Sequence, residues 1–101
     1  MDLGTGDGAA VLRLARQCPD AVVIGVDASA DALMDASRRA RKASRGTGSV
    51  NALFLVGDAR EALELLRGHV HELRIVLPWG SLLRPILDGE EAFALAVAGA
   101  L

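Results

Sequence analysis

The sequence predicts an α/β domain in which four parallel strands lie in the order 3-2-1-4 and helices connect them. The first observation is a turn of alternating glycines, Gly4, Gly6 and Gly8, between a short apolar segment and a helical pattern. The second is Asp27, an acid that follows an apolar strand about 20 residues after this turn. The third is the alternation of strand-like and helix-like segments along the chain, which is typical of parallel sheets.

The elements of the first half follow from apolar spacing and from residues that start or end helices. Met1–Leu3 form a short first strand before the glycine turn. Apolar residues then recur at helical spacing until Pro19, which ends the helix. Ser29 is a suitable N-cap for the next helix, because its hydroxyl can accept a backbone N–H. We therefore expect a helix over Gly8–Gln17, a strand over Ala21–Val26 and a helix from Ser29 to about Ala43.

The second half contains two pairs of acids with the spacing of a capping box. Asp58 and Glu61 indicate the start of a short helix, and Asp88 and Glu91 indicate the start of the last one. Pro78 ends the fourth strand, because proline cannot donate to a strand ladder. The expected elements are strands over Ala52–Val56 and Leu73–Leu77, and helices over Ala59–Leu66 and Gly89–Ala100.

Residues 1–101 are expected to form one partial domain. The first strand of a doubly wound sheet is central and has roughly five or six residues, yet only Met1–Leu3 precede the turn here. A complete domain of this kind also has strands after the last predicted helix. We therefore expect a sheet that is truncated at both ends, either because the chain is a fragment or because its start is misplaced.

Composition limits the class of protein. The chain has 101 residues, of which 51% are hydrophobic, so it can bury a modest core. Its net charge of −2 means that any nucleic-acid binding requires a local basic patch. Cys18 is the single cysteine, and His69 and His71 are the only histidines, so we expect neither an internal disulfide nor a metal site. Without a signal peptide or a long apolar run, the chain is expected to be cytoplasmic.

The glycine turn can accommodate two kinds of ligand. A dinucleotide would place its pyrophosphate at the start of the following helix, beside the like charge of Asp7. S-adenosylmethionine has no phosphate and carries a sulfonium and an amino group, which acids at Asp2 and Asp7 tolerate or favour. A tight turn without any ligand is the third possibility, although three glycines and Asp27 argue against it. The residues favour S-adenosylmethionine.

The end of the second helix is basic and leads into a segment rich in glycine and serine. Cations near a helix C-terminus offset the helix dipole, so a solvated face is one interpretation. The other is a patch that contacts nucleic-acid phosphates, and periodicity does not separate the two. The basic residues are Arg38, Arg39, Arg41, Lys42 and Arg45.

The fourth strand leads into a second informative segment, Pro78-Trp79-Gly80-Ser81-Leu82-Leu83-Arg84. It places the single tryptophan at the carboxyl edge of the sheet, beside the glycine turn. Trp79 is either part of the core or a platform on which an unstacked base can lie.

Together these segments resemble the Rossmann-like class I S-adenosylmethionine-dependent methyltransferases. The strings DLGTGDG, VIGVDAS, RKASRGTGSVNALFLVGDAREAL and LPWGSLLR cover most of the chain. They are most similar to the kanamycin–apramycin resistance methyltransferases, which modify 16S rRNA in the 30S subunit. The glycine motif belongs to the wider superfamily, whereas the PWGxLL string is the more specific signal. The resemblance implies methylation of adenine N1 at the decoding site, which blocks some aminoglycosides.

The resemblance also implies roles for individual residues. Trp79, with Pro78 before it, would hold the target base at the catalytic position, and RNA contacts would come from Arg41, Lys42, Arg45, Trp79 and Ser81. The cofactor would be bound by Asp2, Gly4, Thr5, Gly6, Gly8, Asp27, Ala28, Asp58, Ala59, Glu61 and Leu77.

The residues before the tryptophan are consistent with this target. Leu77 cannot accept a proton or a hydrogen bond, so it does not suit methylation of an exocyclic amine. A ring nitrogen such as adenine N1 has a free lone pair and needs positioning more than a general base. The alternative for this chain is a non-catalytic or truncated Rossmann-like nucleotide-binding module.

Overall fold

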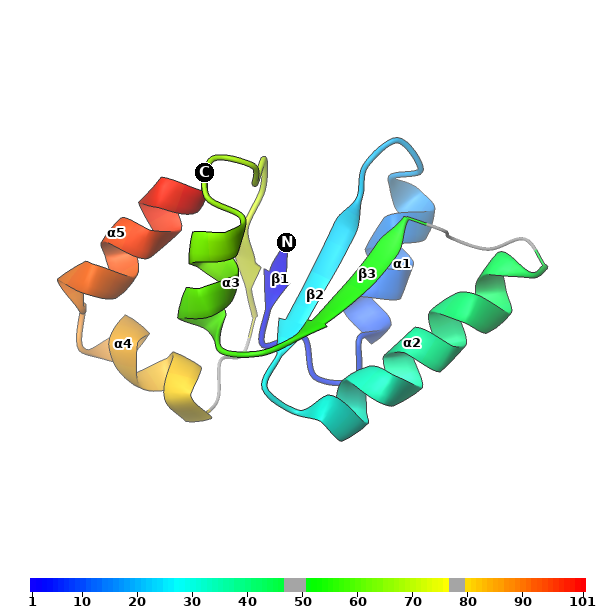
Figure 1. Ribbon diagram of the computed structural model, residues 1–101, viewed down its shortest axis with the longest axis horizontal. Helices are drawn as coiled ribbons and strands as arrows, with labels where there is room; N and C mark the ends of the chain where they lie inside the picture. The colour runs from blue at the N-terminus through cyan, green and yellow to red at the C-terminus, as the bar shows by residue number, and fades with distance from the viewer. Residues whose placement is uncertain (47–50, 77–79) are drawn as a thin grey trace.

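The computed structural model describes residues 1–46, 51–76 and 80–101 of the chain (Figure 1). Within these residues the strands and helices alternate as the sequence predicts. In chain order they are β1 (Asp2–Leu3), α1 (Ala9–Gln17), β2 (Val23–Asp27), α2 (Ala30–Ser44), β3 (Ala52–Val56), α3 (Ala59–Leu65), β4 (Arg74–Ile75), the 3-10 turn η1 (Gly80–Leu82), α4 (Leu83–Leu87) and α5 (Glu91–Ala100).

The described strands form one parallel sheet in the order β3-β2-β1-β4, which confirms the predicted topology. Asp2 lies opposite Gly25 in β2 and Arg74 in β4, so β1 occupies the interior of the sheet. β2 pairs with β3 along its whole length, from Val23 to Asp27. The carboxyl ends of β1, β2 and β3 therefore meet at one edge of the sheet, where the glycine turn begins.

Helices cover both faces of the sheet (Figure 1). The chain moves from β1 to β2 to β3 in one direction, so right-handed crossovers place α1 and α2 on the same face. The connection from β3 back to β4 runs in the opposite direction and places α3 on the other face, where α5 packs beside it. No helix in the described part of the chain has the length and apolar character that a membrane span requires.

Alternate residues of β2 face the two layers, as expected for an extended strand. Val23 packs with Val11 and Ala15 of α1, whereas Val26 packs with Leu63 of α3 and with Phe93 of α5. All six side chains are buried. The sheet is thus held by an apolar cluster on each side, and its carboxyl edge is left to the connecting turns.

Helix caps fix the start of two elements as the sequence predicts. Ser29 accepts a hydrogen bond from the N–H of Ala32 through Oγ at 3.4 Å, and Asp58 accepts one from the N–H of Arg60 at 2.8 Å.

Asn51 adds a link that the sequence does not predict. Its side-chain amide donates to the carbonyls of Ala15, Cys18 and Ala21, at 2.9, 2.9 and 2.8 Å.

The region after β4 differs from the expectation. The fourth strand was expected over Leu73–Leu77, but its ladder spans only Arg74–Ile75, because its partner β1 has only two residues. The segment from Gly80 to Leu87, for which the sequence predicts no helix, forms η1 and α4. Pro85 is accommodated in the first turn of α4, where its missing N–H has no helical partner.

The predicted capping box at Asp88 and Glu91 is wrong. Asp88 is the C-cap of α4 and donates its N–H to the carbonyl of Arg84 at 2.9 Å. Gly89 then takes a left-handed conformation with φ of 61°, and α5 begins at Glu91 with Glu90 as its extended N-cap. The glycine reverses the chain between two helices, so Asp88 belongs to the end of the first and not to the start of the second.

Candidate functional site

The glycine turn after β1 uses the conformations that only glycine adopts readily. Gly4, Gly6 and Gly8 have φ of 71°, 59° and 72°. The N–H groups of Gly4 and Thr5 both donate to the carbonyl of Val26, at 2.8 and 3.1 Å, so the turn continues directly past the end of β2. Gly4 is exposed at this edge of the sheet.

Gly8 has a packing role within this turn. It is buried, and a Cβ at this position would lie 2.6 Å from Cβ of Ala36 and 2.7 Å from Cε1 of Phe54. Residues of α2 and β3 thus leave no room for a side chain at the turn before α1. Gly6, by contrast, has no atom within 4 Å of such a Cβ.

Asp27 ties the glycine turn to the turn after β2. Its Oδ2 accepts the N–H of Gly6 at 2.8 Å, and its Oδ1 accepts the N–H of Ser29 at 2.9 Å. A carboxylate has about four acceptor positions, so each oxygen keeps capacity for a further donor. The side chain is half-buried at the end of β2, where a ligand hydroxyl can reach it.

The turns after β1, β2 and β3 enclose a crevice of about 80 Å³. The turn after β3 is joined to β2 by a hydrogen bond from the N–H of Gly57 to the carbonyl of Asp27, at 3.0 Å. Leu82 of η1 closes the crevice from the side of β4 and is 7% exposed. The lining residues are Gly4, Val26, Asp27, Ala28, Gly57, Asp58, Ala59 and Leu82.

Five residues predicted to bind the cofactor line this crevice, namely Gly4, Asp27, Ala28, Asp58 and Ala59. Asp2 is buried in β1, Thr5, Gly6 and Gly8 lie in the adjoining turn, and Glu61 is exposed in the first turn of α3. Leu77, Pro78 and Trp79 lie outside the described residues, as does the side chain of Ser81.

Leu82 lines the crevice but is not predicted from the sequence to do so. A Cβ on Gly4 would lie 3.0 Å from Cδ2 of Leu82, so the two residues are in close approach. The apolar end of the PWGSLL string was a usable signal, because it follows the strand beside β1. Its spacing alone does not say which leucine faces the crevice.

The site contains features that suit a small polar ligand. Among the described residues, the hydroxyl of Thr5 is the buried side-chain group without a hydrogen-bond partner. An unpaired buried hydroxyl is costly, so a ligand or a water molecule near the glycine turn would stabilise it. The open backbone at Gly4, the spare acceptor positions of Asp27 and this hydroxyl fit a nucleoside with polar substituents.

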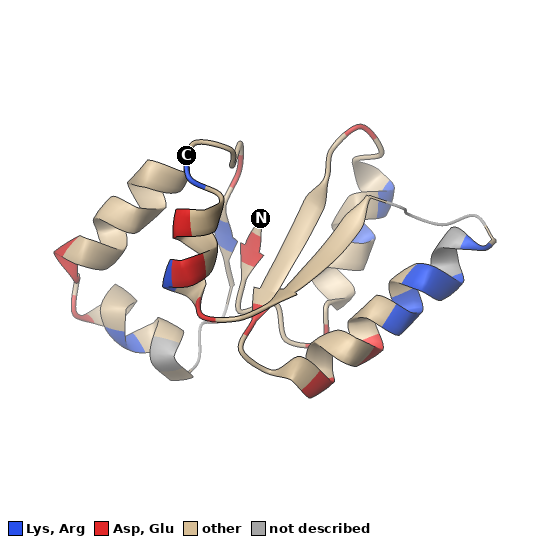
Figure 2. Ribbon diagram, in the orientation of Figure 1, with Lys and Arg blue, Asp and Glu red and all other residues tan. Residues whose placement is uncertain are grey.

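The basic residues of α2 lie toward the opposite edge of the sheet (Figure 2). A helix of 15 residues is about 22 Å long. Arg41, Lys42 and Arg45, near its carboxyl end, are exposed and are not brought to the crevice. Acidic Asp31 and Asp35 occupy the amino-terminal half instead.

A groove of about 420 Å³ between α1 and α2 connects this basic end with the glycine turn. Arg39 is exposed, and its guanidinium donates to the backbone carbonyl of Asp7. The groove is lined by Ala9, Leu12, Arg16, Arg39 and Lys42. Arg16 was not expected in a basic surface, since it lies on α1, far from the other cations in sequence.

Comparisons with known proteins agree with this geometry. The family model described as "NpmA: 16S rRNA (adenine(1408)-N(1))-methyltransferase" matches residues 1–100. A 16S rRNA (adenine(1408)-N(1))-methyltransferase of Streptoalloteichus tenebrarius is 40% identical over 87 residues. These residues are 86% of this chain and 40% of that protein.

Solved structures show the same arrangement of strands and helices. The aminoglycoside resistance methyltransferase NpmB1 is 36% identical with a TM-score of 0.88, over 99% of this chain and 48% of that one. A variant of the 16S rRNA (adenine(1408)-N(1))-methyltransferase of Catenulisporales acidiphilia, crystallised with its cosubstrate SAM, is 27% identical. Its TM-score is 0.86 over 98% of this chain and 48% of that one.

The chain therefore spans about half the length of these structures. The part of this chain that matches them includes the glycine turn, the residues that line the crevice and the basic helix α2. From the family match over residues 1–100 and from the identity to the Streptoalloteichus protein, the chain belongs to the NpmA family of 16S rRNA (adenine(1408)-N(1))-methyltransferases.

Proposed function

We propose that the protein carrying this sequence methylates N1 of an adenine in 16S rRNA, within the 30S subunit, and thereby confers aminoglycoside resistance. The observation that carries the proposal is the convergence of Gly4, Asp27 and Ala59 on one crevice, in a chain of this family. S-adenosylmethionine is the proposed cofactor, and the cytoplasm, where ribosomes are found, is the proposed location.

The crevice residues have chemically distinct tasks in this proposal. Asp27 accepts the ribose hydroxyls with the lone pairs that the N–H groups of Gly6 and Ser29 leave free. Ala59 borders the adenine, and the Thr5 hydroxyl pairs with a polar group of the methionine portion. Asp2, buried beneath the turn, provides a negative charge that favours a cationic ligand. When bound, S-adenosylmethionine supplies an electrophilic methyl group on its sulfonium.

The target nitrogen explains why no general base is assigned. Adenine N1 has an in-plane lone pair and no proton to lose, so the enzyme has to position the base in line with the methyl group. We assign this positioning to Trp79, on which the extruded adenine stacks, and to Pro78, which orients the tryptophan. Leu77 presents no competing acceptor to the base.

The RNA backbone is proposed to contact the basic end of α2, through Arg41, Lys42 and Arg45, with Ser81 nearer the target base. Exposed cations that neutralise phosphates release counterions and bind without regard to sequence. They lie at the carboxyl end of a helix about 22 Å long that begins just after β2, which suits a large rRNA surface that reaches both this end and the crevice.

The test is a methylation assay with purified 30S subunits and radiolabelled S-adenosylmethionine, followed by primer extension through the decoding site. We expect incorporation of the label and a reverse-transcription stop at the target adenine. Calorimetry with S-adenosylmethionine and with NAD separates the two cofactor classes. Tighter binding of NAD, or no label in the rRNA, would contradict the proposal.

A tryptophan variant tests the assigned mechanism. Trp79→Ala should remove a stacking contact of roughly 1–3 kcal/mol per base, and the loss should appear mainly in turnover. Trp79→Phe should retain part of the activity, because a smaller ring still offers a π-face. Binding of S-adenosylmethionine should change little in either variant. An alanine variant that binds the cofactor and methylates 30S subunits at the normal rate would refute the stacking role.

A further inference from the structure

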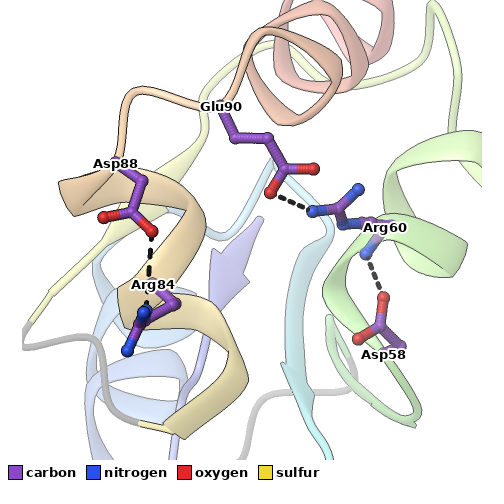
Figure 3. Close-up of polar contacts among 5 residues, drawn as sticks. All are labelled: Asp58, Arg60, Arg84, Asp88 and Glu90. Carbon is purple, nitrogen blue, oxygen red and sulfur yellow. Dashed lines mark hydrogen bonds and ion pairs between the residues drawn. The ribbon is translucent and has the colours of Figure 1, made fainter.

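Arg60 connects the crevice to α5 through its side chain. It follows directly on the turn that contributes Gly57, Asp58 and Ala59 to the crevice. Its backbone N–H donates to Oδ1 of Asp58 at 2.8 Å, and its Nη2 donates to Oε2 of Glu90 at 2.5 Å (Figure 3). The residues of the ion pair are 30 positions apart in the chain.

The surroundings of this pair keep it charged and ordered. The guanidinium carbon of Arg60 lies 6.0 Å from the centroid of the Phe93 ring, a buried side chain of α5. The hydrogen bond that Arg60 donates to the Glu90 carboxylate raises the pKa of the guanidinium above its ordinary value. The side chains of Arg60 and Glu90 are 43% and 40% exposed, so water weakens the pair without removing it.

Glu90 is joined by backbone hydrogen bonds to the segment that carries Leu82. Its N–H donates to the carbonyl of Pro85 at 2.9 Å, and the N–H of Gly89 donates to the carbonyl of Ile86 at 3.3 Å. Together with α4 and η1, these bonds make residues 80–90 one compact unit. Leu82, at its start, lines the same crevice as Ala59.

The two walls of the crevice, which are the Gly57–Ala59 turn and the segment that carries Leu82, also share apolar contacts. Leu82 is buried in the cluster that includes Leu63 and Phe93, and Ala59 packs against that cluster. Apolar contact is non-directional and does not by itself fix the spacing of two backbones. An arginine and a carboxylate at hydrogen-bond distance do constrain it, because their geometry is directional and charge-assisted.

We propose that Arg60 and Glu90 form a positioning clasp, which holds the Gly57–Ala59 turn against the Leu82 segment and so sets the affinity of the crevice for its cofactor. This inference rests on the proposed function, because it takes S-adenosylmethionine as the ligand between the two walls. Neither residue contacts the reacting atoms, and the clasp acts through the placement of Ala59 and Leu82.

The test compares two arginine–carboxylate pairs in the same region. Arg60→Met and Glu90→Gln remove the clasp. Arg84→Met and Asp88→Asn are the controls, and they remove an exposed ion pair at the end of α4. In this pair Nε of Arg84 lies 3.5 Å from Oδ2 of Asp88, and neither residue belongs to the crevice turn. For the clasp variants we expect the Kd for S-adenosylmethionine to rise roughly three- to tenfold, as for a partly exposed hydrogen-bonded ion pair. The control variants should bind like the unmodified protein.

Two further readouts separate positioning from general stability. The KM for S-adenosylmethionine should rise in the clasp variants, while the KM for 30S subunits and kcat at saturating cofactor stay the same. The exchange Arg60→Glu with Glu90→Arg should recover part of the lost affinity. Thermal unfolding of each variant shows whether it is folded, and Glu90→Gln alone, which removes the charge of the acceptor, serves where Arg60→Met does not fold.

The outcomes are distinguishable. Clasp variants that bind S-adenosylmethionine as tightly as the α4 controls would overturn the clasp and leave the proposed function intact. The same holds if affinity falls only in proportion to the loss of thermal stability. If the unmodified protein binds no S-adenosylmethionine, the proposed function fails and the clasp fails with it.

Discussion

Asp27 supports the glycine turn and, in the proposed function, also binds the cofactor. We predict that Asp27→Ala weakens S-adenosylmethionine binding by about 1–3 kcal/mol, the range for a lost hydrogen bond to a charged group. The variant should also lower the melting temperature slightly, because the N–H groups of Gly6 and Ser29 lose their acceptor. Calorimetry and thermal unfolding measure the two effects. Asp20→Ala, an exposed aspartate before β2, is the matched control, and equal affinity of both variants would contradict the role of Asp27.

Variants of two glycines in the turn distinguish the cost of a left-handed backbone conformation from the cost of side-chain overlap. Gly6→Ala should cost roughly 1–2 kcal/mol of unfolding free energy, the penalty of a side chain in the left-handed region. Gly8→Ala should cost about 1–3 kcal/mol more, because its Cβ would also overlap Ala36 and Phe54. Urea unfolding of both variants gives the difference directly. Equal costs would mean that α2 moves away easily and that Gly8 is not a packing constraint.

At the residue scale, the sequence identifies those crevice residues whose chemistry is unusual for their position. Asp27 and Gly4 stand out because an acid after a strand and a left-handed glycine each need a reason. Leu82 and Gly57 do not stand out, since apolar residues and turn glycines occur throughout the chain. The Arg60–Glu90 pair is also invisible in the sequence, because it depends on how α3 and α5 pack.

Asn51 joins the start of β3 to the end of α1 at the scale of whole elements. Asn51→Ala removes three hydrogen bonds to backbone carbonyls, and we predict a loss of about 1–3 kcal/mol of unfolding free energy. Gln17→Ala, an exposed change at the last residue of α1, should stay within about 0.5 kcal/mol of the unmodified protein. Chemical denaturation followed by circular dichroism provides both values. An Asn51→Ala variant as stable as the control would show that water replaces the amide at no cost.

Elements with local signals are predicted well, and elements that depend on distant partners are not. The cap residues Ser29 and Asp58 form their hydrogen bonds within three residues, so sequence spacing is sufficient to identify them. The length of β4 depends on β1, its partner in the ladder. The chain can begin α5 only after α4 has ended at Gly89. Because α4 has only five residues, apolar periodicity does not reveal this helix.

On the scale of the whole molecule, charge is distributed unevenly although the net charge is only −2 (Figure 2). Cations gather on α2 toward its carboxyl end and, with Arg16, along the groove beside α1. The crevice edge carries the carboxylates of Asp27 and Asp58 instead. A cationic ligand and an anionic polymer are therefore favoured at different places on one small domain.

This separation predicts that RNA affinity and cofactor affinity can be changed independently. Arg41→Glu with Lys42→Glu should weaken 30S binding, because phosphate contacts and their counterion release are lost. The slope of log affinity against log salt should become shallower by about 1 for each phosphate contact removed. The affinity for S-adenosylmethionine should stay unchanged, since neither residue lines the crevice.

The control for this prediction alters the same net charge elsewhere. Arg67→Glu with Arg84→Glu reverses two exposed cations that follow α3 and lie within α4, away from the α1–α2 groove. Filter binding of 30S subunits across a salt series then compares the two double variants. If the basic end of α2 contacts the RNA, only the Arg41 and Lys42 double variant should change the slope of log affinity against log salt. If both variants lose affinity equally, the effect is one of net charge, and the basic end of α2 is a solvated helix terminus that offsets the dipole.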